Sequence, residues 1–186
     1  MITVNLTIVK DIEMEQLINQ IEQWAEDRNI IKGSKPIDQA MKLFSEFGEL
    51  ADNVGKGRDC RDDIGDCAVV LIIMCRQLKI STIDAIQEED DNYSIKECVA
   101  WAWYWMCSWV SSGMNNNEEL RFIFSNLIEI AKLNNCTLEE CVQIAYDDIS
   151  KRQGILWNGV FVKNTDENFN EIKSLFEKSI ENNLSI

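Results

Sequence analysis

Histidine is absent from this 186-residue chain, and its absence excludes most of the common hydrolytic chemistries. Without an imidazole there is no Ser-His-Asp or Cys-His catalysis, no His-ligated zinc and no histidine general base. The chain also lacks a Gly-rich phosphate loop of the Walker or dinucleotide type. Any hydrolysis that the protein performs must therefore use carboxylates and a metal ion.

Basic residues are also scarce, with 18 Lys and Arg against 32 Asp and Glu and a net charge of −14. This balance argues against nucleic acid as a partner, because a nucleic-acid-binding protein needs a basic surface. No apolar run approaches the ~18–20 residues of a membrane-spanning helix, and no signal-like segment opens the chain. We therefore expect a cytoplasmic protein that does not bind a membrane.

The chain has a single proline and no linker rich in Pro or Gly, so we expect one all-α domain over residues 1–186. Its seven cysteines form no CxxC motif and are odd in number, unlike a zinc site or a secreted disulfide framework. Free cysteines pack as small hydrophobic side chains, and we expect these in the core.

The most informative pattern is a pair of predicted helices within residues 37–78, joined by a short Gly-Lys-Gly turn. The first contains Glu46 and Glu49, and the second contains Asp63 and Asp66. Residues at i and i+3 share a helix face, and a short turn makes two long helices antiparallel neighbours. The two acidic pairs are therefore predicted to face each other across a groove.

Asp66 precedes the apolar run Cys67–Cys75, which is typical of a buried helix. A buried carboxylate is unfavourable unless it is neutralised, paired or bound to a metal. Oxygen ligands of this kind suit Mg²⁺, with Mn²⁺ as a substitute, and Mg²⁺ commonly binds together with phosphates. The alternative is that these acids lie on solvated helix faces, where such spacing is common.

The arrangement Glu-x-x-Glu, 13 intervening residues, Asp-x-x-Asp resembles the MazG-like family of all-α nucleoside triphosphate pyrophosphohydrolases, whose signature is EExxE, a spacer, then ExxD. The resemblance covers roughly residues 20–80 and 136–164. It implies an antiparallel helical bundle, a closing C-terminal segment at about 137–186, and a homodimer or homotetramer. Ser45 and Asp63 depart from the signature, since the family has Glu at both positions.

The resemblance implies that Glu46, Glu49, Asp63 and Asp66 bind Mg²⁺ and that the substrate is a nucleoside triphosphate, hydrolysed to the monophosphate and pyrophosphate. Glu46 or Glu49 would accept the proton of the attacking water. The other candidates would bind the substrate. Its phosphates would be bound by Lys42, one turn before Glu46, and by Lys151 and Arg152, with Lys163 a weaker candidate. Its base would be bound by Trp24, Gln39 and Asn158. For each basic residue the alternative is a solvated side chain, and for Trp24 it is a packed one.

Three further features leave alternatives open. Trp101, Trp105 and Trp109 form a predicted helical stripe, which indicates core or an oligomer interface, or else a base-stacking surface. Residues 124–131 repeat the pattern of residues 44–51, through a degenerate internal duplication or by coincidence. Residues 2–9 are expected to form either a short extended arm or a loop.

Two other classes of protein fit the same sequence. The first is a non-catalytic helical module for binding or oligomerisation, which has kept the fold while its site drifted, as Ser45 and Asp63 permit. The second is an acidic protein that mimics nucleic acid, which predicts a surface stripe of negative charge.

Overall fold

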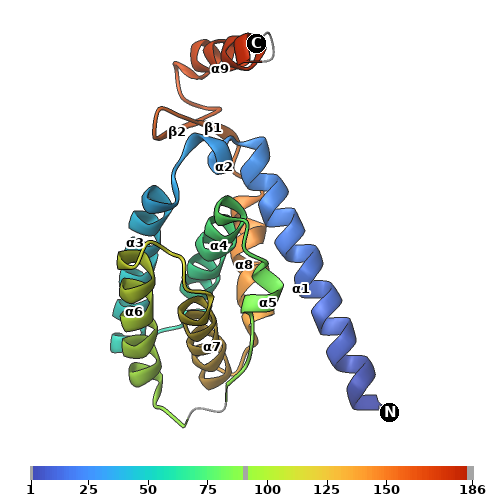
Figure 1. The fold of residues 1–186 in the computed structure, drawn as a ribbon, viewed down its shortest axis with the longest axis vertical. Helices are drawn as coiled ribbons and strands as arrows, with labels where there is room; N and C mark the ends of the chain where they lie inside the picture. Colours follow the sequence, from blue (N-terminus) through green and yellow to red (C-terminus); the bar gives the residue numbers. More distant parts are fainter. Residues whose placement is uncertain (1, 90–91, 184–186) are drawn as a thin grey trace.

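A computed structural model of the chain describes residues 2–89 and 92–183. The predicted domain also includes residues 1, 90–91 and 184–186, which lie outside the described residues. In the described part there are nine helices and one two-stranded sheet, so the protein is mainly helical, as predicted (Figure 1). No helix among these residues is both long enough and apolar enough to cross a bilayer.

The helices and strands follow one another with short connections. In order they are α1 (Ile2–Asp27), α2 (Ile30–Gly33), α3 (Pro36–Lys56), α4 (Arg61–Leu78), α5 (Thr82–Ala85), α6 (Ile95–Ser111), α7 (Asn117–Leu133), α8 (Leu138–Ile149), β1 (Gly154–Trp157), β2 (Val160–Lys163) and α9 (Phe169–Asn183).

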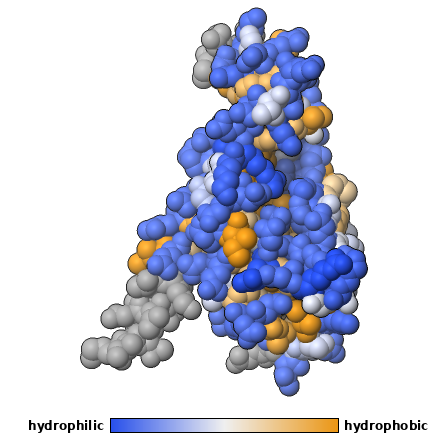
Figure 2. All heavy atoms as spheres, turned by 180° about the vertical axis from the view of Figure 1, so that it is seen from behind, coloured by the Kyte–Doolittle hydropathy of each residue, from blue (hydrophilic) through white to orange (hydrophobic). Residues whose placement is uncertain are grey.

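Helix α4 is the centre of the bundle and packs against α1, α3, α7 and α8. Its apolar run is buried on all sides, as the sequence predicts, with Leu71 and Met74 fully inaccessible to solvent. Burial of a large aliphatic side chain contributes roughly 1.5–3 kcal/mol, so this helix supplies much of the core. The surface seen in Figure 2 is mainly hydrophilic, with hydrophobic side chains in separate small groups.

The predicted α3–α4 pair is confirmed, with small shifts at its ends. Helix α3 continues through Gly55 and stops at Gly57, whose φ of 64° is left-handed and favours glycine. Helix α4 begins after Cys60, and Asp59 accepts a hydrogen bond from the Arg61 amide at 3.2 Å. This tight connection holds the two helices side by side.

Residues 154–163 form a β-hairpin. Its strands pair antiparallel, with Gly154 opposite Lys163 and Trp157 opposite Val160. Asn158 and Gly159 form the turn with φ of 49° and 80°, as an Asn-Gly type I′ turn requires. The hairpin contacts α2 and α9, and α9 extends away from the bundle at the end where the hairpin lies (Figure 1).

The interpretation of residues 2–9 as an extended arm or loop is wrong, because these residues belong to helix α1. Their β-branched residues lower helix propensity by only a few tenths of a kcal/mol each, and extending an existing helix is easier than starting one. The two similar octapeptides lie in α3 and α7, and their origin by duplication stays a prediction.

The four tryptophans of α6 do not share one environment. Trp109 is fully buried, and Trp105 is half-buried and stacked on Phe122 with 4.6 Å between ring centroids. Trp101 and Trp103 remain 41% and 42% exposed. The predicted stripe is therefore core at its C-terminal end and exposed at its N-terminal end.

Candidate active site

Three of the four predicted carboxylates line one cleft between α3 and α4. Glu46 and Glu49 face it from α3, and Asp66 faces it from α4. The cleft has a volume of about 630 Å³, and α1, α2, the end of α8 and the β-hairpin close its other sides. The i, i+3 spacing and the short interhelical turn therefore bring three of the four predicted carboxylates to one cleft.

Glu46 is the most buried of these acids, with an exposed fraction of 6%. It forms an ion pair with Lys42, one helical turn earlier on the same side of α3. The Lys42 side chain is itself more than half exposed and also lines the cleft. The predicted acidic residue Glu46 and the predicted basic residue Lys42 thus lie side by side in the cleft.

Asp66 lies in an environment that disfavours its charge. Burial raises the pKa of Asp66 to about 6, and the carboxylates of Glu46 and Asp62 add to this increase. Lys42 and Arg152 act in the opposite direction. The cleft therefore has excess negative charge, which a cation would relieve.

Asp63 is placed differently from the other three. It is half-buried near the start of α4, accepts a hydrogen bond from Asn53 Nδ2 at 2.8 Å, and is not among the residues that line the cleft. Burial raises the pKa of Asp63, with the Asn53 hydrogen bond acting against it. The Glu46–Glu49 pair therefore contributes both of its carboxylates to the cleft, whereas the Asp63–Asp66 pair contributes only Asp66.

The donor atoms suit a hard divalent cation, because all of them are carboxylate oxygens beside other carboxylates. The positions of these carboxylates fit a metal ion less well than their donor atoms do. Within residues 2–89 and 92–183, no three Cys, Asp or Glu side chains converge closely enough to hold a metal ion. The Lys42–Glu46 ion pair occupies the carboxylate that lies deepest in the cleft.

Of the predicted phosphate-binding residues beyond α3, Arg152 lines the cleft and Lys151 does not. Arg152 follows α8 and forms an ion pair with Asp148, and its carbonyl oxygen accepts a hydrogen bond from Arg28 Nε at 2.8 Å. This bond fixes the backbone of Arg152 to the end of α1. Lys151 and Lys163 are exposed outside the cleft.

Part of the cleft lining is apolar and aromatic. Trp24 lines it from α1, and Leu156 and Phe161 line it from the hairpin. The Arg28 guanidinium lies over the Trp24 ring at 4.9 Å from its centroid. Trp24 Nε1 is buried and has no hydrogen-bond partner among the residues that the structure describes.

Gln39 also lines the cleft, and its neighbours determine how its amide is oriented. The Ser34 hydroxyl donates to the Ile30 carbonyl at 2.7 Å, so its oxygen can only accept from other groups. It accepts from Gln39 Nε2 at 2.9 Å and from Gln77 Nε2 at 3.0 Å. The Gln39 amide is therefore oriented with its nitrogen toward Ser34.

Asn158, the other residue predicted to read a base, is exposed in the hairpin turn and does not line the cleft, whereas its neighbour Gly159 does. Ser34, Phe161 and Leu156 were not predicted. The Asn-Gly pair was the available signal, because a two-residue turn returns the chain and places Phe161 beside Leu156. Nothing local in the sequence shows that this hairpin packs on α2.

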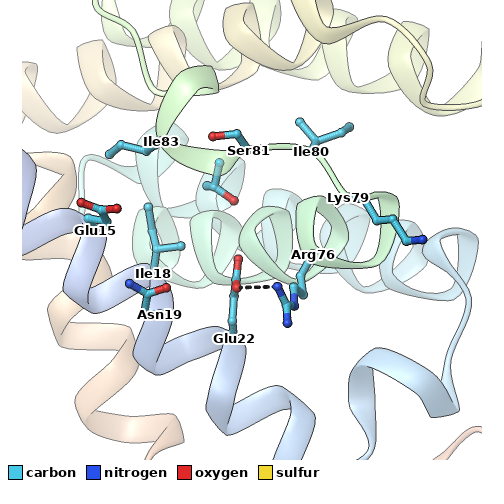
Figure 3. Close-up of a pocket in the computed structure, with 10 residues that line it drawn as sticks. Glu15, Ile18, Asn19, Glu22, Arg76, Lys79, Ile80, Ser81 and Ile83 are labelled. Carbon is cyan, nitrogen blue, oxygen red and sulfur yellow. Dashed lines mark ion pairs between the residues drawn. The ribbon is translucent and has the colours of Figure 1, made fainter.

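A second cleft, of about 650 Å³, lies between α1 and the segment joining α4 to α5 (Figure 3). Glu22 of α1 and Arg76 of α4 face each other in it, with 3.5 Å between Oε2 and Nη1. Arg76 also pairs with Glu26 at 2.7 Å. None of the predicted site residues lines this cleft, and its charges neutralise one another.

No protein-family model matches the chain, and no solved structure matches it. Among curated proteins it is similar to the uncharacterized 18.2 kDa protein in the rep-hol intergenic region of Haemophilus phage HP1. The identity is 47% over 73 residues, which are 38% of this chain and 45% of the phage protein. The chain thus spans less than half the length of that relative, and the likeness assigns no activity.

Proposed function

We propose that the protein is a Mg²⁺-dependent nucleoside triphosphate pyrophosphohydrolase of the all-α type. The observation that carries the proposal is the single cleft in which Glu46, Glu49 and Asp66 lie with Lys42 and Arg152. Trp24 and Gln39 line the same cleft. The combination of charged, aromatic and amide side chains supports a ligand that carries both phosphates and a planar base.

In the proposed reaction, water attacks the α-phosphorus and the α–β bridging oxygen leaves with pyrophosphate. Mg²⁺, held by Glu46, Glu49 and Asp66, would supply charge neutralisation of the phosphates and a more acidic water. Glu49 is our choice for the proton acceptor. It lines the cleft and has no ion pair in the described part of the chain, whereas Glu46 is paired with Lys42.

The remaining groups bind and orient the substrate. Lys42 and Arg152 place positive charge beside the carboxylates, where a triphosphate needs it. The apolar and aromatic lining excludes water from one face of a base, and Gln39 accepts a hydrogen bond from its edge. We propose a cytoplasmic role in nucleotide-pool sanitation or in the balance of deoxynucleotides, since this reaction removes triphosphates.

The test is to incubate the purified protein with Mg²⁺ and each canonical NTP and dNTP and to measure pyrophosphate and orthophosphate separately. We expect pyrophosphate with at least one nucleotide, and a loss of about 10²–10⁴-fold in Glu49→Gln. Asp52→Asn is the matched control, because Asp52 is an exposed carboxylate on the same helix that pairs with Lys56 outside the cleft. Orthophosphate without pyrophosphate would contradict the proposed bond cleavage.

A non-catalytic helical module is the second candidate, and two observations favour it. No three acidic side chains converge among the described residues, and Lys42 already neutralises Glu46. This candidate predicts no pyrophosphate from any nucleotide and no effect of Mg²⁺ on the melting temperature. The same assay therefore separates the two candidates.

A further inference from the structure

Helix α8 begins with a capping box that is enclosed by two cysteines. The Glu140 amide donates to the Thr137 hydroxyl oxygen at 3.1 Å, and the Thr137 amide donates to the Glu140 carboxylate at 2.8 Å. Cys136 directly precedes the N-cap residue Thr137, and Cys141 is the fourth residue of the helix. These two positions commonly hold apolar side chains that pack against each other. In this chain they bring two thiols together.

The two thiols are in direct contact, and their hydrogen bonds have a direction. The sulfur atoms of Cys136 and Cys141 lie 3.5 Å apart. The Cys136 thiol donates to the Ala131 carbonyl at 3.3 Å, so the proton between the two sulfurs belongs to Cys141. Burial raises the pKa of the Cys141 thiol, and its hydrogen bond to Cys136 adds to the increase. Cys141 therefore keeps its proton in the folded chain and directs it at the Cys136 sulfur.

The two sulfurs differ in their access to solvent. Cys136 is one of the two half-buried cysteines, the other being Cys107 of α6, whereas Cys141 is fully buried. A reagent in solution therefore meets the Cys136 thiol and not the Cys141 thiol. An accessible thiol beside a protected one is the arrangement of an attacking and a resolving cysteine, in which the second thiol completes a disulfide bond that the first begins.

Closing the 3.5 Å contact to a disulfide bond of about 2.0 Å requires only a small movement. Cys141 is not free to make it, because its main chain is packed against Gly65 of α4. Cys136 lies in the short connection between α7 and α8, outside both helices. Its thiol would give up the bond to the Ala131 carbonyl, while its amide keeps its own 3.1 Å bond to that oxygen. The movement therefore falls on Cys136 and leaves α4 and α8 in place.

Cys60 is the third thiol of this region and the rival partner for Cys136. It is buried immediately before α4. Burial raises the pKa of Cys60 to about 11, and the nearby Asp63 and Cys136 add to the increase. The Asn134 side chain is hydrogen-bonded to the Cys60 thiol, whereas Cys136 and Cys141 are bonded to each other. The contacts therefore favour the pairing of Cys136 with Cys141.

We propose that Cys136 and Cys141 are a site of reversible thiol modification, at which a small-molecule disulfide converts the two thiols to an intrachain disulfide. In the first step the Cys136 sulfur attacks one sulfur of the reagent, the reagent S–S bond breaks, and one reagent thiol leaves with the Cys136 proton. In the second step the Cys141 sulfur attacks the Cys136 sulfur, and the other reagent thiol leaves with the Cys141 proton. Two protein thiols are oxidised and the reagent is reduced to two thiols. The proposal does not depend on the proposed enzymatic function.

The test is to incubate the purified full chain with an excess of 2-hydroxyethyl disulfide and to map its thiols by mass spectrometry. This reagent is uncharged, so a chain of net charge −14 does not repel it. Cleavage by trypsin after Lys132 and Lys151 gives one peptide, residues 133–151, that contains Cys136 and Cys141 and no other cysteine. We expect this peptide to lose the mass of two hydrogen atoms, and dithiothreitol to restore it.

Single substitutions separate the two roles. Cys141→Ala should stop after the first step, with one reagent thiol attached to Cys136. Cys136→Ala should leave Cys141 unmodified, because Cys141 is fully buried. Cys107→Ser is the matched control, since Cys107 is also half-buried but lies in α6, and its peptide 133–151 should be oxidised as in the wild type. Circular dichroism checks that each variant keeps the wild-type helix content.

Three results would overturn the proposal. A wild-type peptide 133–151 that keeps both thiols, or that carries a reagent thiol without losing two hydrogen atoms, would show that the two cysteines only pack at the start of α8. A cross-link between peptide 133–151 and the tryptic peptide 59–61 would assign the disulfide to Cys60 instead. Modification of Cys141 in the Cys136→Ala variant would show that Cys136 is not the attacking thiol.

Discussion

Gly65 of α4 lies directly against the main-chain carbonyl group of Cys141 in α8. A Cβ atom at position 65 would overlap the Cys141 carbonyl oxygen and would lie 2.9 Å from the Ala145 Cβ. Because the obstacle is backbone rather than a flexible side chain, the two helices would have to separate. The close packing of α4 on α8 beside Asp66 therefore depends on glycine at this position.

We expect Gly65→Ala to lower the free energy of unfolding by about 2–3 kcal/mol, as overpacking of a tight core contact does. Urea unfolding followed by circular dichroism measures it. Gly55→Ala is the control, because nothing lies within 4 Å of a Cβ there and Gly55 is within helix α3. That variant should gain about 0.5–1 kcal/mol. Equal effects of the two substitutions would contradict the close contact.

Removing the Ser34 hydroxyl should weaken substrate binding without slowing the chemical step. Ser34→Ala removes the acceptor that fixes the Gln39 amide. Loss of this hydrogen bond should weaken substrate binding by about 1 kcal/mol, which is roughly a five-fold increase in KM with kcat unchanged. Steady-state kinetics on the preferred nucleotide measures both constants. Ser45→Ala, at an exposed residue of α3 outside the cleft, should leave KM as it is. A fall in kcat alone would assign Ser34 a different role.

The α3–α4 half of the site could be predicted because its geometry is local. Helical spacing alone places Gln39, Lys42, Glu46 and Glu49 on one side of α3, and a glycine turn then fixes the next helix. Asp63 shows the limit of this reasoning. It shares a face with Asp66, but Asn53 donates a hydrogen bond to it at the first turn of α4. The i, i+3 spacing of the two aspartates does not predict this contact.

The hairpin half of the site could not be predicted, because long-range contacts position it. The Leu156 amide donates to the Arg28 carbonyl at 2.9 Å, and Asn29 Nδ2 donates to the Leu156 carbonyl at 2.9 Å. These bonds join residues more than 120 positions apart in the chain. They bring Phe161 to the cleft, although the sequence around it indicates only a short hairpin.

Glu22 should make the stability of the protein depend on pH. Burial raises the pKa of Glu22 above its ordinary value of 4.5, against the effect of Arg76. The folded chain therefore holds this proton more tightly than the unfolded chain does. The resulting stability is complete below about pH 4.5 and is lost as the pH rises through the higher folded-state pKa.

We therefore expect Glu22→Gln to gain stability relative to the wild type on going from about pH 4 to about pH 7.5. Thermal unfolding at a series of pH values gives the difference in melting temperature. Glu15→Gln, which changes an exposed carboxylate of the same cleft outside the ion pair with Arg76, is the matched control. A Glu22→Gln difference that shrinks as the pH rises would show that the ion pair with Arg76 outweighs burial.

Asp66 and Asp63 should differ in their contribution to metal binding, although the sequence presents them as an equivalent pair. Asp66 lines the cleft with Glu46 and Glu49, whereas Asp63 is bonded to Asn53 outside it. We expect Mg²⁺ to raise the melting temperature of the wild type and of Asp63→Asn, but not of Asp66→Asn.

Pyrophosphate release should fall more than 100-fold in Asp66→Asn and less than about ten-fold in Asp63→Asn. Asp62→Asn, at an exposed residue of the same helical turn, is the control and should match the wild type. Equal losses in Asp63→Asn and Asp66→Asn would mean that metal binding draws both aspartates into the cleft, with release of the Asn53 hydrogen bond.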